Sequence, residues 1–333
     1  MVNRAPSING DTVNGRTVQI HITTHGSDWY WTVTAVMVVS TMIILGLGFT
    51  KPRTHRIFHY ITAAITLVAA IAYFTMASNL GWTPINVEWR RSGDVAGVNR
   101  QIFYARYIDW FITTPLLLFD ILLTAGLPWP TLLYTVLMDW IMVISGLIGA
   151  LVQSTYKWGY YVFGCAALIQ IAWTVVFIGR KHAYALGSDV HRTYLICGCW
   201  TMFLWLLYPI CWGLCEGGNV ISPDSEAVFY GILDILAKPV FGALLLWGHR
   251  NIDPGRMGLT IRDYEEGAST AAPGVAATRS GGRFSFAHRG HKEKAAEGTN
   301  GVGHTNGVNE PTPGATTGAN GTTGTTQTPE QAV

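Results

Sequence analysis

The chain has few charged residues for its length. Asp, Glu, Lys and Arg make up 13% of its 333 residues, about half the share that is usual in a soluble domain. Hydrophobic residues make up 49%, so a soluble enzyme is a poor match. The formal net charge is only +2, which gives no support to nucleic-acid binding by the whole chain.

Cysteine is also scarce, and its placement excludes two kinds of site. The five cysteines are Cys165, Cys197, Cys199, Cys211 and Cys215, all inside long apolar runs. An odd set of this kind forms neither a disulfide framework nor a zinc-binding spacing. We therefore interpret them as small packing residues and expect no metal site.

Large apolar residues are nearly missing from the C-terminal segment 267–333. Gly and Thr account for 25 of its 67 residues, and a segment of this composition cannot bury a hydrophobic core. We expect it to be disordered. A solvated appendage is the favoured interpretation, while recruitment of an unidentified partner remains the alternative.

Seven apolar runs are long enough to cross a bilayer. The first, Trp29–Thr50, has no formal charge over 22 residues, which spans about 30 Å at 1.5 Å per residue. The others are about Ile57–Gly81, Gln101–Leu123, Pro130–Val152, Trp158–Gly179, Thr193–Cys215 and Ala227–Gly248. The sequence thus predicts an all-α membrane protein, a seven-transmembrane-helix bundle, with a small hairpin in the loop from about Trp82 to Arg100.

Basic residues predict the orientation of the bundle, because cytoplasmic loops carry an excess of Lys and Arg. One side would hold Lys51, Arg53, Arg56, Arg180, Lys181, Arg192, Arg250, Arg256 and Arg262. The other would hold Arg16, Arg90, Arg91, Arg100 and Lys157. We therefore expect an extracellular arm (1–27), a transmembrane domain (28–250) and a cytoplasmic tail (251–333), with the plasma membrane as the favoured location.

Ionisable residues interrupt the predicted spans. They are Arg106, Asp109, Asp120, Asp139, Asp234 and Lys238. Each costs roughly 2.5–3.5 kcal/mol near the centre of a membrane helix, so such residues usually mark an ion pathway or a ligand. Asp139 is the weakest of the set, since an interhelical hydrogen bond explains it as well as a direct role does.

The third span carries a polar stripe. Asp109 and Asp120 are eleven residues apart, which is nearly three full helical turns, so both carboxylates share a face about 16 Å apart along the axis. Arg106 lies one turn outward of Asp109, and Thr113 one turn inward. This face reaches across most of a membrane.

The seventh span places Asp234 one helical turn before Lys238. A buried lysine beside a carboxylate forms either a simple ion pair or a Schiff-base amine whose cationic imine needs a counterion. The spacing alone does not separate these interpretations. On the sixth span Trp205, Tyr208, Pro209 and Trp212 form one face beside a proline kink, typical of plain packing or, opposite a buried lysine, of the walls of a flat apolar ligand.

These motifs resemble microbial rhodopsins of the bacteriorhodopsin type. The resemblance is carried by Arg106–Trp110 and Thr113–Asp120 on the third span, Trp205–Pro209 on the sixth and Leu233–Lys238 on the seventh. The stretch Cys215–Glu226 and the tetrapeptide Asp28–Trp31 are similar to the fungal pump branch. The resemblance covers about Asp28 to Arg250 and leaves out the N-terminal arm and the tail.

The resemblance implies a chromophore and a set of roles. All-trans retinal would be bound to Lys238 as a protonated Schiff base, with Asp109 and Asp234 as counterions. Asp109 would accept the proton, Asp120 would return one from the cytoplasm, and Arg106, Glu216 and Glu226 would handle release outside. The retinal pocket would comprise Trp110, Thr113, Thr114, Leu117, Asp139, Met142, Gly146, Trp205, Tyr208, Pro209 and Trp212.

The function implied is light-driven outward proton pumping rather than enzymatic catalysis. A light sensor on the same fold is the main alternative, and the carboxylate at Asp120 favours the pump because sensors often lack a donor there. A retinal-free opsin-related protein is disfavoured by Lys238. The expected partners are retinal, protons and the lipid bilayer, and a homo-oligomer is left open.

Overall fold

Seven membrane-spanning rods, each a single helix or a run of consecutive helices, make up most of the part of the chain that the computed structural model describes, residues 3–88 and 98–259. The first four are single helices: α2 (Thr24–Phe49), α3 (Ile57–Ala77), α4 (Tyr104–Thr124) and α5 (Trp129–Leu151). The last three contain π-helical turns. They are α6–η2–α7 (Lys157–Trp173, Thr174–Gly179, Arg180–Leu186), α8–η3 (Ser188–Trp212, Gly213–Gly217) and α9–η4–α10 (Pro223–Ile235, Leu236–Val240, Phe241–His249).

The predicted number of spans is confirmed, but several predicted ends are wrong. The first helix begins at Thr24 rather than Trp29, because the Thr23 hydroxyl caps it by accepting the amide of His25 and so satisfies one exposed N–H. The fifth rod continues through α7 to Leu186, past the predicted end at Gly179. This extension includes Arg180 and Lys181, whose charges made it look like a loop.

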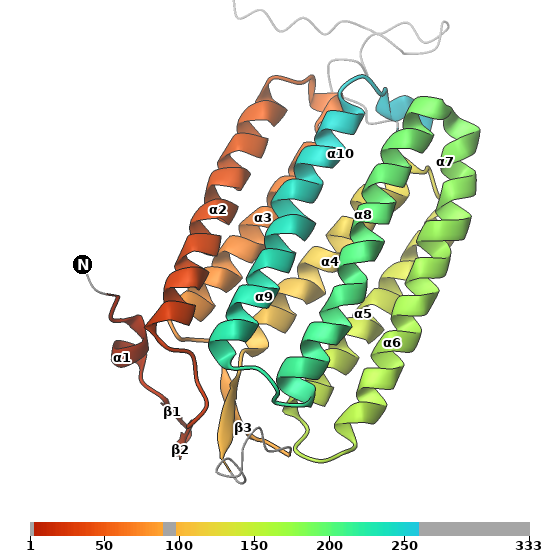
Figure 1. The fold of residues 1–333 in the computed structure, drawn as a ribbon. Coiled ribbons are helices and arrows are strands. Elements are labelled where there is room, and N and C mark those ends of the chain that lie inside the picture. Colours follow the sequence, from red (N-terminus) through yellow and green to blue (C-terminus); the bar gives the residue numbers. More distant parts are fainter. Residues whose placement is uncertain (1–2, 89–97, 260–333) are drawn as a thin grey trace, which may run out of the picture. The chain divides into compact units, whose positions relative to one another are not determined.

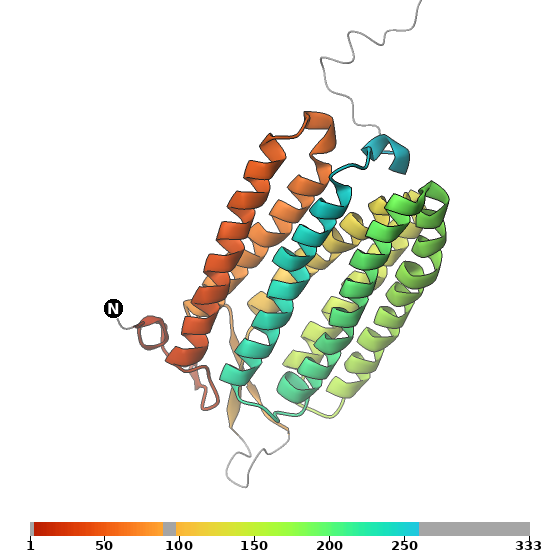
Figure 2. The same cartoon turned by 45° about the horizontal axis from the view of Figure 1, so that its top comes forward.

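The helices pack as a closed ring in chain order. Each rod lies against the next one, and α9 returns to pack against α2; Figures 1 and 2 show this arrangement from two directions. The helix α4 packs against α3 and α5 and also contacts α8 and η2. It therefore presents one face to several helices at once, which explains why its polar stripe is buried.

Two pairs of short strands lie at one end of the bundle, where Figure 1 labels β1, β2 and β3. β3 (Thr83–Asn86) and β4 (Asn99–Ile102) pair antiparallel, with Thr83 opposite Ile102, so the hairpin predicted in this loop is confirmed. β1 (Thr12–Val13) and β2 (Arg16–Thr17) form a second pair. The short helices α1 (Ala5–Asn9), η1 (Arg53–His55) and η5 (Pro254–Met257) complete the described elements.

Apolar side chains fill the core of the bundle and also cover its outside. Large residues such as Met42, Phe49, Leu67 and Phe163 are exposed along the helices, as expected for rods that face hydrocarbon instead of water. The protein is thus an integral, multi-pass membrane protein. The expected disorder of 267–333 and the basic residues Arg90, Arg91 and Arg262 lie outside the described residues.

Candidate functional site

Lys238 lies inside a π-helical turn in the middle of the seventh rod. The turn spans Leu236–Val240 and contains Pro239, which has no amide hydrogen and so cannot donate to the preceding helical turn. Such local widening is frequent at functional sites. Lys238 is 1% exposed, and its Nζ lies 2.5 Å from Asp109 Oδ2 and 3.4 Å from Asp234 Oδ2.

The two carboxylates beside Lys238 differ in their other partners. Asp234 accepts hydrogen bonds of 2.6 Å from the hydroxyls of Tyr73 and Tyr208, one on each oxygen. Asp109 Oδ1 has no hydrogen-bond partner among the described residues. Asp234 is consequently held by two phenols as well as by the amine, whereas Asp109 keeps one oxygen open to a further proton or donor.

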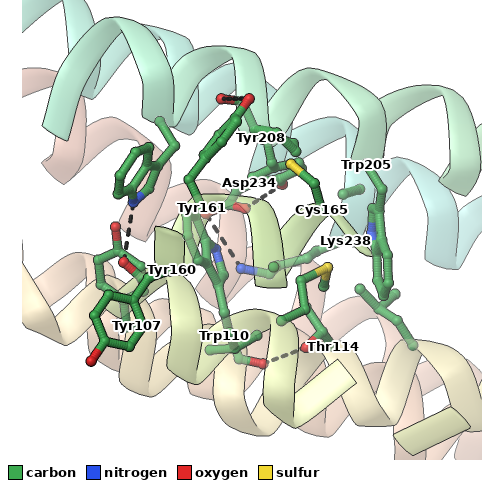
Figure 3. Close-up of a pocket in the computed structure, with 18 residues that line it drawn as sticks. Tyr107, Trp110, Thr114, Tyr160, Tyr161, Cys165, Trp205, Tyr208, Asp234 and Lys238 are labelled. Carbon is green, nitrogen blue, oxygen red and sulfur yellow. Dashed lines mark hydrogen bonds and ion pairs between the residues drawn. The ribbon is translucent and has the colours of Figure 1, made fainter. Parts of the chain in front are cut away.

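An aromatic-lined cavity surrounds the Lys238 side chain (Figure 3). Trp110 and Tyr208 meet edge to face on one part of its wall, with ring centroids 5.3 Å apart. Trp212 forms another part, and its indole N–H donates to the backbone oxygen of Gly146 over 3.1 Å. Among the predicted pocket residues, the lining includes Trp110, Thr114, Leu117, Met142, Gly146, Trp205, Tyr208, Pro209 and Trp212.

Two predicted pocket residues do not line this cavity. The Thr113 hydroxyl turns back to the backbone oxygen of Asp109, 2.8 Å away, and the side chain is fully buried. Asp139 lies behind Thr114, whose hydroxyl donates to Asp139 Oδ2 over 2.7 Å. This hydrogen bond joins α4 to α5, which is the interhelical role that the sequence left open for Asp139.

Sequence reasoning missed one side of the cavity. Its lining also includes Tyr107, Val143, Tyr160, Tyr161, Gly164, Cys165 and Ala237, and four of these come from α6. Tyrosine and small residues on an apolar helix carry no distinguishing pattern, so no signal in the sequence would have separated them from ordinary packing. Cys165 therefore lines the cavity as well as packing, and all five cysteines are free thiols.

Asp120 lies on α4, as Asp109 does, toward the end opposite the hairpins. Its side chain is fully buried, and Thr62 of α3 donates to Oδ2 over 3.1 Å. Its helical neighbours Leu117, Ile121 and Leu123 belong to the apolar core. A carboxyl group in such surroundings, with no cation among its described contacts, is suited to hold a proton until a nearby base needs one.

Arg106 connects the cavity region to a second cluster at the hairpin end. Its Nη1 lies 2.6 Å from Glu226 Oε1 and 3.3 Å from Glu216 Oε1, and its Nη2 donates to the Tyr30 hydroxyl over 2.9 Å. The structure therefore brings together all three residues predicted for this side. It adds Arg100 of β4, 2.6 Å from Glu226 Oε2, which the sequence gave no reason to single out.

The arrangement places groups that can carry protons at successive depths of the bundle. Buried carboxyl groups stand at successive levels, a lysine amine lies between them, and arginine and tyrosine side chains connect the last level to the hairpin end. The cavity fits a flat, apolar group joined to the amine, because its walls are aromatic and two carboxylates lie beside the amine to pair with a buried cation.

Comparisons with known proteins agree with this geometry. The family model described as bacteriorhodopsin-like protein matches residues 24–252. The chain is 66% identical over 265 residues to the opsin-like protein carO of Fusarium fujikuroi, a match that covers 79% of this chain and 86% of that one.

Solved structures resemble the chain over its helical part. A light-driven proton pump from Leptosphaeria maculans is 38% identical with a TM-score of 0.67, covering 70% of this chain and 100% of that one. The light-driven proton pump rhodopsin of Coccomyxa subellipsoidea is 41% identical with a TM-score of 0.65, covering 68% and 98%. With seven helices, a buried lysine and these relatives, the chain belongs to the bacteriorhodopsin-like proteins, a membrane family of retinal-binding ion pumps and photoreceptors.

Proposed function

We propose that this protein is a light-driven outward proton pump, with all-trans retinal bound to Lys238 as a protonated Schiff base. One observation carries the proposal. Asp109 lies at the Lys238 amine, and Asp120 shares the same face of α4 about 16 Å away along the axis, so a proton acceptor and a proton donor flank the amine at different depths.

The chromophore, when bound, would supply light absorption and an isomerisation that changes which way the proton on the Lys238 nitrogen points. The chain's own residues would then decide where that proton goes. Asp109 would accept it through its open oxygen, because the Tyr73 and Tyr208 hydroxyls stabilise Asp234 as a carboxylate. Asp120, kept neutral by its apolar neighbours, would return a proton to the amine from the other side.

The direction of transport follows from the orientation. In this proposal the end that carries Lys51, Arg56, Arg180 and Arg250 faces the cytoplasm, and the hairpin end faces outward. Asp120 then lies on the cytoplasmic side of Lys238, while Arg106, Glu216 and Glu226 lie on the outer side as the release group. Protons would be taken up inside and released outside, in keeping with a place in the plasma membrane.

Asp109→Asn tests the assignment of the acceptor. The substitution keeps the size of the side chain but removes the group that accepts a proton, so we expect a coloured protein whose net light-driven transport is abolished, a loss of at least about a hundredfold. The measurement is the light-induced pH change of a suspension of retinal-supplied cells. A fully pumping Asp109→Asn variant would contradict the assignment of Asp109 as the acceptor.

A further inference from the structure

Arg100 is a buried arginine in a strand outside the membrane-spanning helices. It lies on β4 and is 1% exposed. Its Nη2 donates to Glu226 Oε2 over 2.6 Å, and its Nη1 donates to Asn219 Oδ1 over 2.6 Å and to the backbone oxygen of Ile221 over 2.8 Å. Burying a guanidinium is costly without a paired carboxylate, so these contacts indicate a fixed position against Glu226.

Glu226 and Glu216 have unequal partners. Each Glu226 oxygen accepts a 2.6 Å bond from a different arginine, Arg100 or Arg106. The Glu216 oxygens accept from Tyr107 at 3.1 Å, Tyr230 at 3.2 Å and Arg106 at 3.3 Å. Charge-assisted bonds are the short ones, so the geometry is that of an ionised Glu226 beside a Glu216 that carries a proton.

The balance of buried charge points the same way. The described ion pairs between the cavity and the hairpin end contain three cations, Arg100, Arg106 and Lys238. Asp109, Asp234 and Glu226 balance them, and Glu216 is a fourth carboxyl. Since an uncompensated buried charge is expensive, Glu216 is the group that stays neutral. Lys157 and Glu88, which line a cavity beside it, add one charge of each sign and leave the balance unchanged.

Glu216 also has the more direct way out. A small cavity at the hairpin end is lined by Glu216, Asn219, Arg100, Lys157 and Glu88, together with residues of β3. Glu226 is not part of its lining. A proton that leaves Glu216 thus reaches the polar groups of this cavity without first crossing the Arg100–Glu226 pair.

We propose that Arg100 is a positioning residue that holds Glu226 ionised, so that Glu216 is the carboxyl group that carries the proton released on the outer side. The assignment rests on the proposed pumping function and adds to it a single release site and the residue that selects it. In support, burial alone would lower the pKa of Arg100, but the neighbouring Glu226 carboxylate outweighs that effect and raises this pKa. Arg100 therefore stays charged.

Several other ionisable groups surround Glu216 and act on its titration. They are Arg106 and Tyr107 from α4, Lys157 from α6, Cys215 from η3, Glu226 and Tyr230 from α9, Arg100 from β4, Tyr30 from α2 and Glu88. Replacement of Arg100 removes one positive charge and leaves the other groups in place. The proton on the cluster should then be held more tightly.

The test is an infrared pH titration, in the dark, of the full-length protein in lipid nanodiscs. The signal is the protonated carboxyl absorption that is lost as the pH rises, since Asp120 in its apolar site contributes a constant background. We expect the signal to disappear in Glu216→Gln and to persist, displaced to lower pH, in Glu226→Gln, where Glu216 would balance the freed arginine. In Arg100→Gln the midpoint of the titration should rise by about one to two pH units. In Arg100→Lys, which keeps the positive charge, the midpoint should return most of the way to the wild-type value. Arg16→Gln, a surface arginine on the same side, should leave it unchanged.

Two results would overturn the inference. One is the reverse pattern, in which Glu226→Gln abolishes the signal and Glu216→Gln only displaces it. The other is an unchanged midpoint in Arg100→Gln. If the Arg100 variants do not fold, the two glutamate variants still decide the question. The titration needs no transport, so a wild-type protein that fails to pump would count against the proposed function while the site of the proton is still read.

Discussion

Hydrogen-bond partners separate two aspartates that the sequence makes equivalent. Asp109 and Asp234 both lie beside Lys238, yet Tyr73 and Tyr208 tie down Asp234. A carboxylate that accepts two phenolic hydrogen bonds is stabilised in its charged form, so it binds a proton less readily than a carboxylate with an open oxygen. The geometry therefore favours Asp109 as the acceptor and Asp234 as a fixed counter-charge.

Asp120→Asn should leave a coloured protein that recovers slowly after a flash. The amide cannot supply a proton, so reprotonation of the Lys238 nitrogen should slow by about a hundredfold. Flash photolysis in the visible range measures this rate. Asp139→Asn, the same change in another buried carboxyl group on α5, should keep a rate close to that of the wild type. Normal recovery in Asp120→Asn would count against its role as donor.

The sequence predicts charged residues better than their neutral partners. Asp109, Asp120, Lys238 and Arg106 stand out because a charge in an apolar span is costly. Tyr73 gives no such signal, since a tyrosine on an apolar helix is unremarkable until its hydroxyl is seen to reach Asp234. Arg100 is hidden for another reason, because its burial depends on how the β3–β4 hairpin folds over the bundle.

A single residue connects the helices α7 and α8. Gly187 has φ 122°, a conformation that side-chain-bearing residues rarely adopt, and an added Cβ would contact the Arg256 guanidinium. That guanidinium binds Asp189 at the start of α8 through contacts of 2.6 and 2.9 Å. The turn is thus fixed both by backbone conformation and by an ion pair.

Gly187→Ala should destabilise the folded protein by about 1–3 kcal/mol. Heating the retinal-bound protein and recording the loss of its visible absorption measures the change as a lower transition temperature. Gly46→Ala is the matched control, since a Cβ there meets open space on α2 and alanine favours a helix. Equal transition temperatures for both variants would show that the turn does not limit stability.

At the level of elements, apolar length predicts the number of spans but not their ends. Twenty uncharged residues can satisfy their backbone groups in a bilayer only as a helix, so the seven spans were predictable. Where a helix continues into a charged stretch, as at Arg180 and Lys181, the pattern becomes polar although the backbone stays helical. The π-helical turn at Lys238 was equally hidden, since Pro239 alone does not specify it.

Across the whole molecule, every residue assigned to proton transfer lies between Thr24 and His249. Residues 276–333 lie outside the described part of the chain. Deleting 276–333 should therefore leave the colour and the rate of light-driven transport per folded molecule unchanged. The pH change in light, normalised to visible absorption, measures this rate. A truncated protein that is coloured but no longer pumps would mean that the tail takes part in transport.

Outward proton pumping is tested most directly by the pH of an unbuffered suspension of retinal-supplied cells that express the wild-type chain. Under green light, the medium should become more acidic, and a protonophore should abolish this change. A coloured protein with no pH change would contradict pumping and favour a light sensor. No colour in well-expressed protein would contradict the binding of retinal at Lys238.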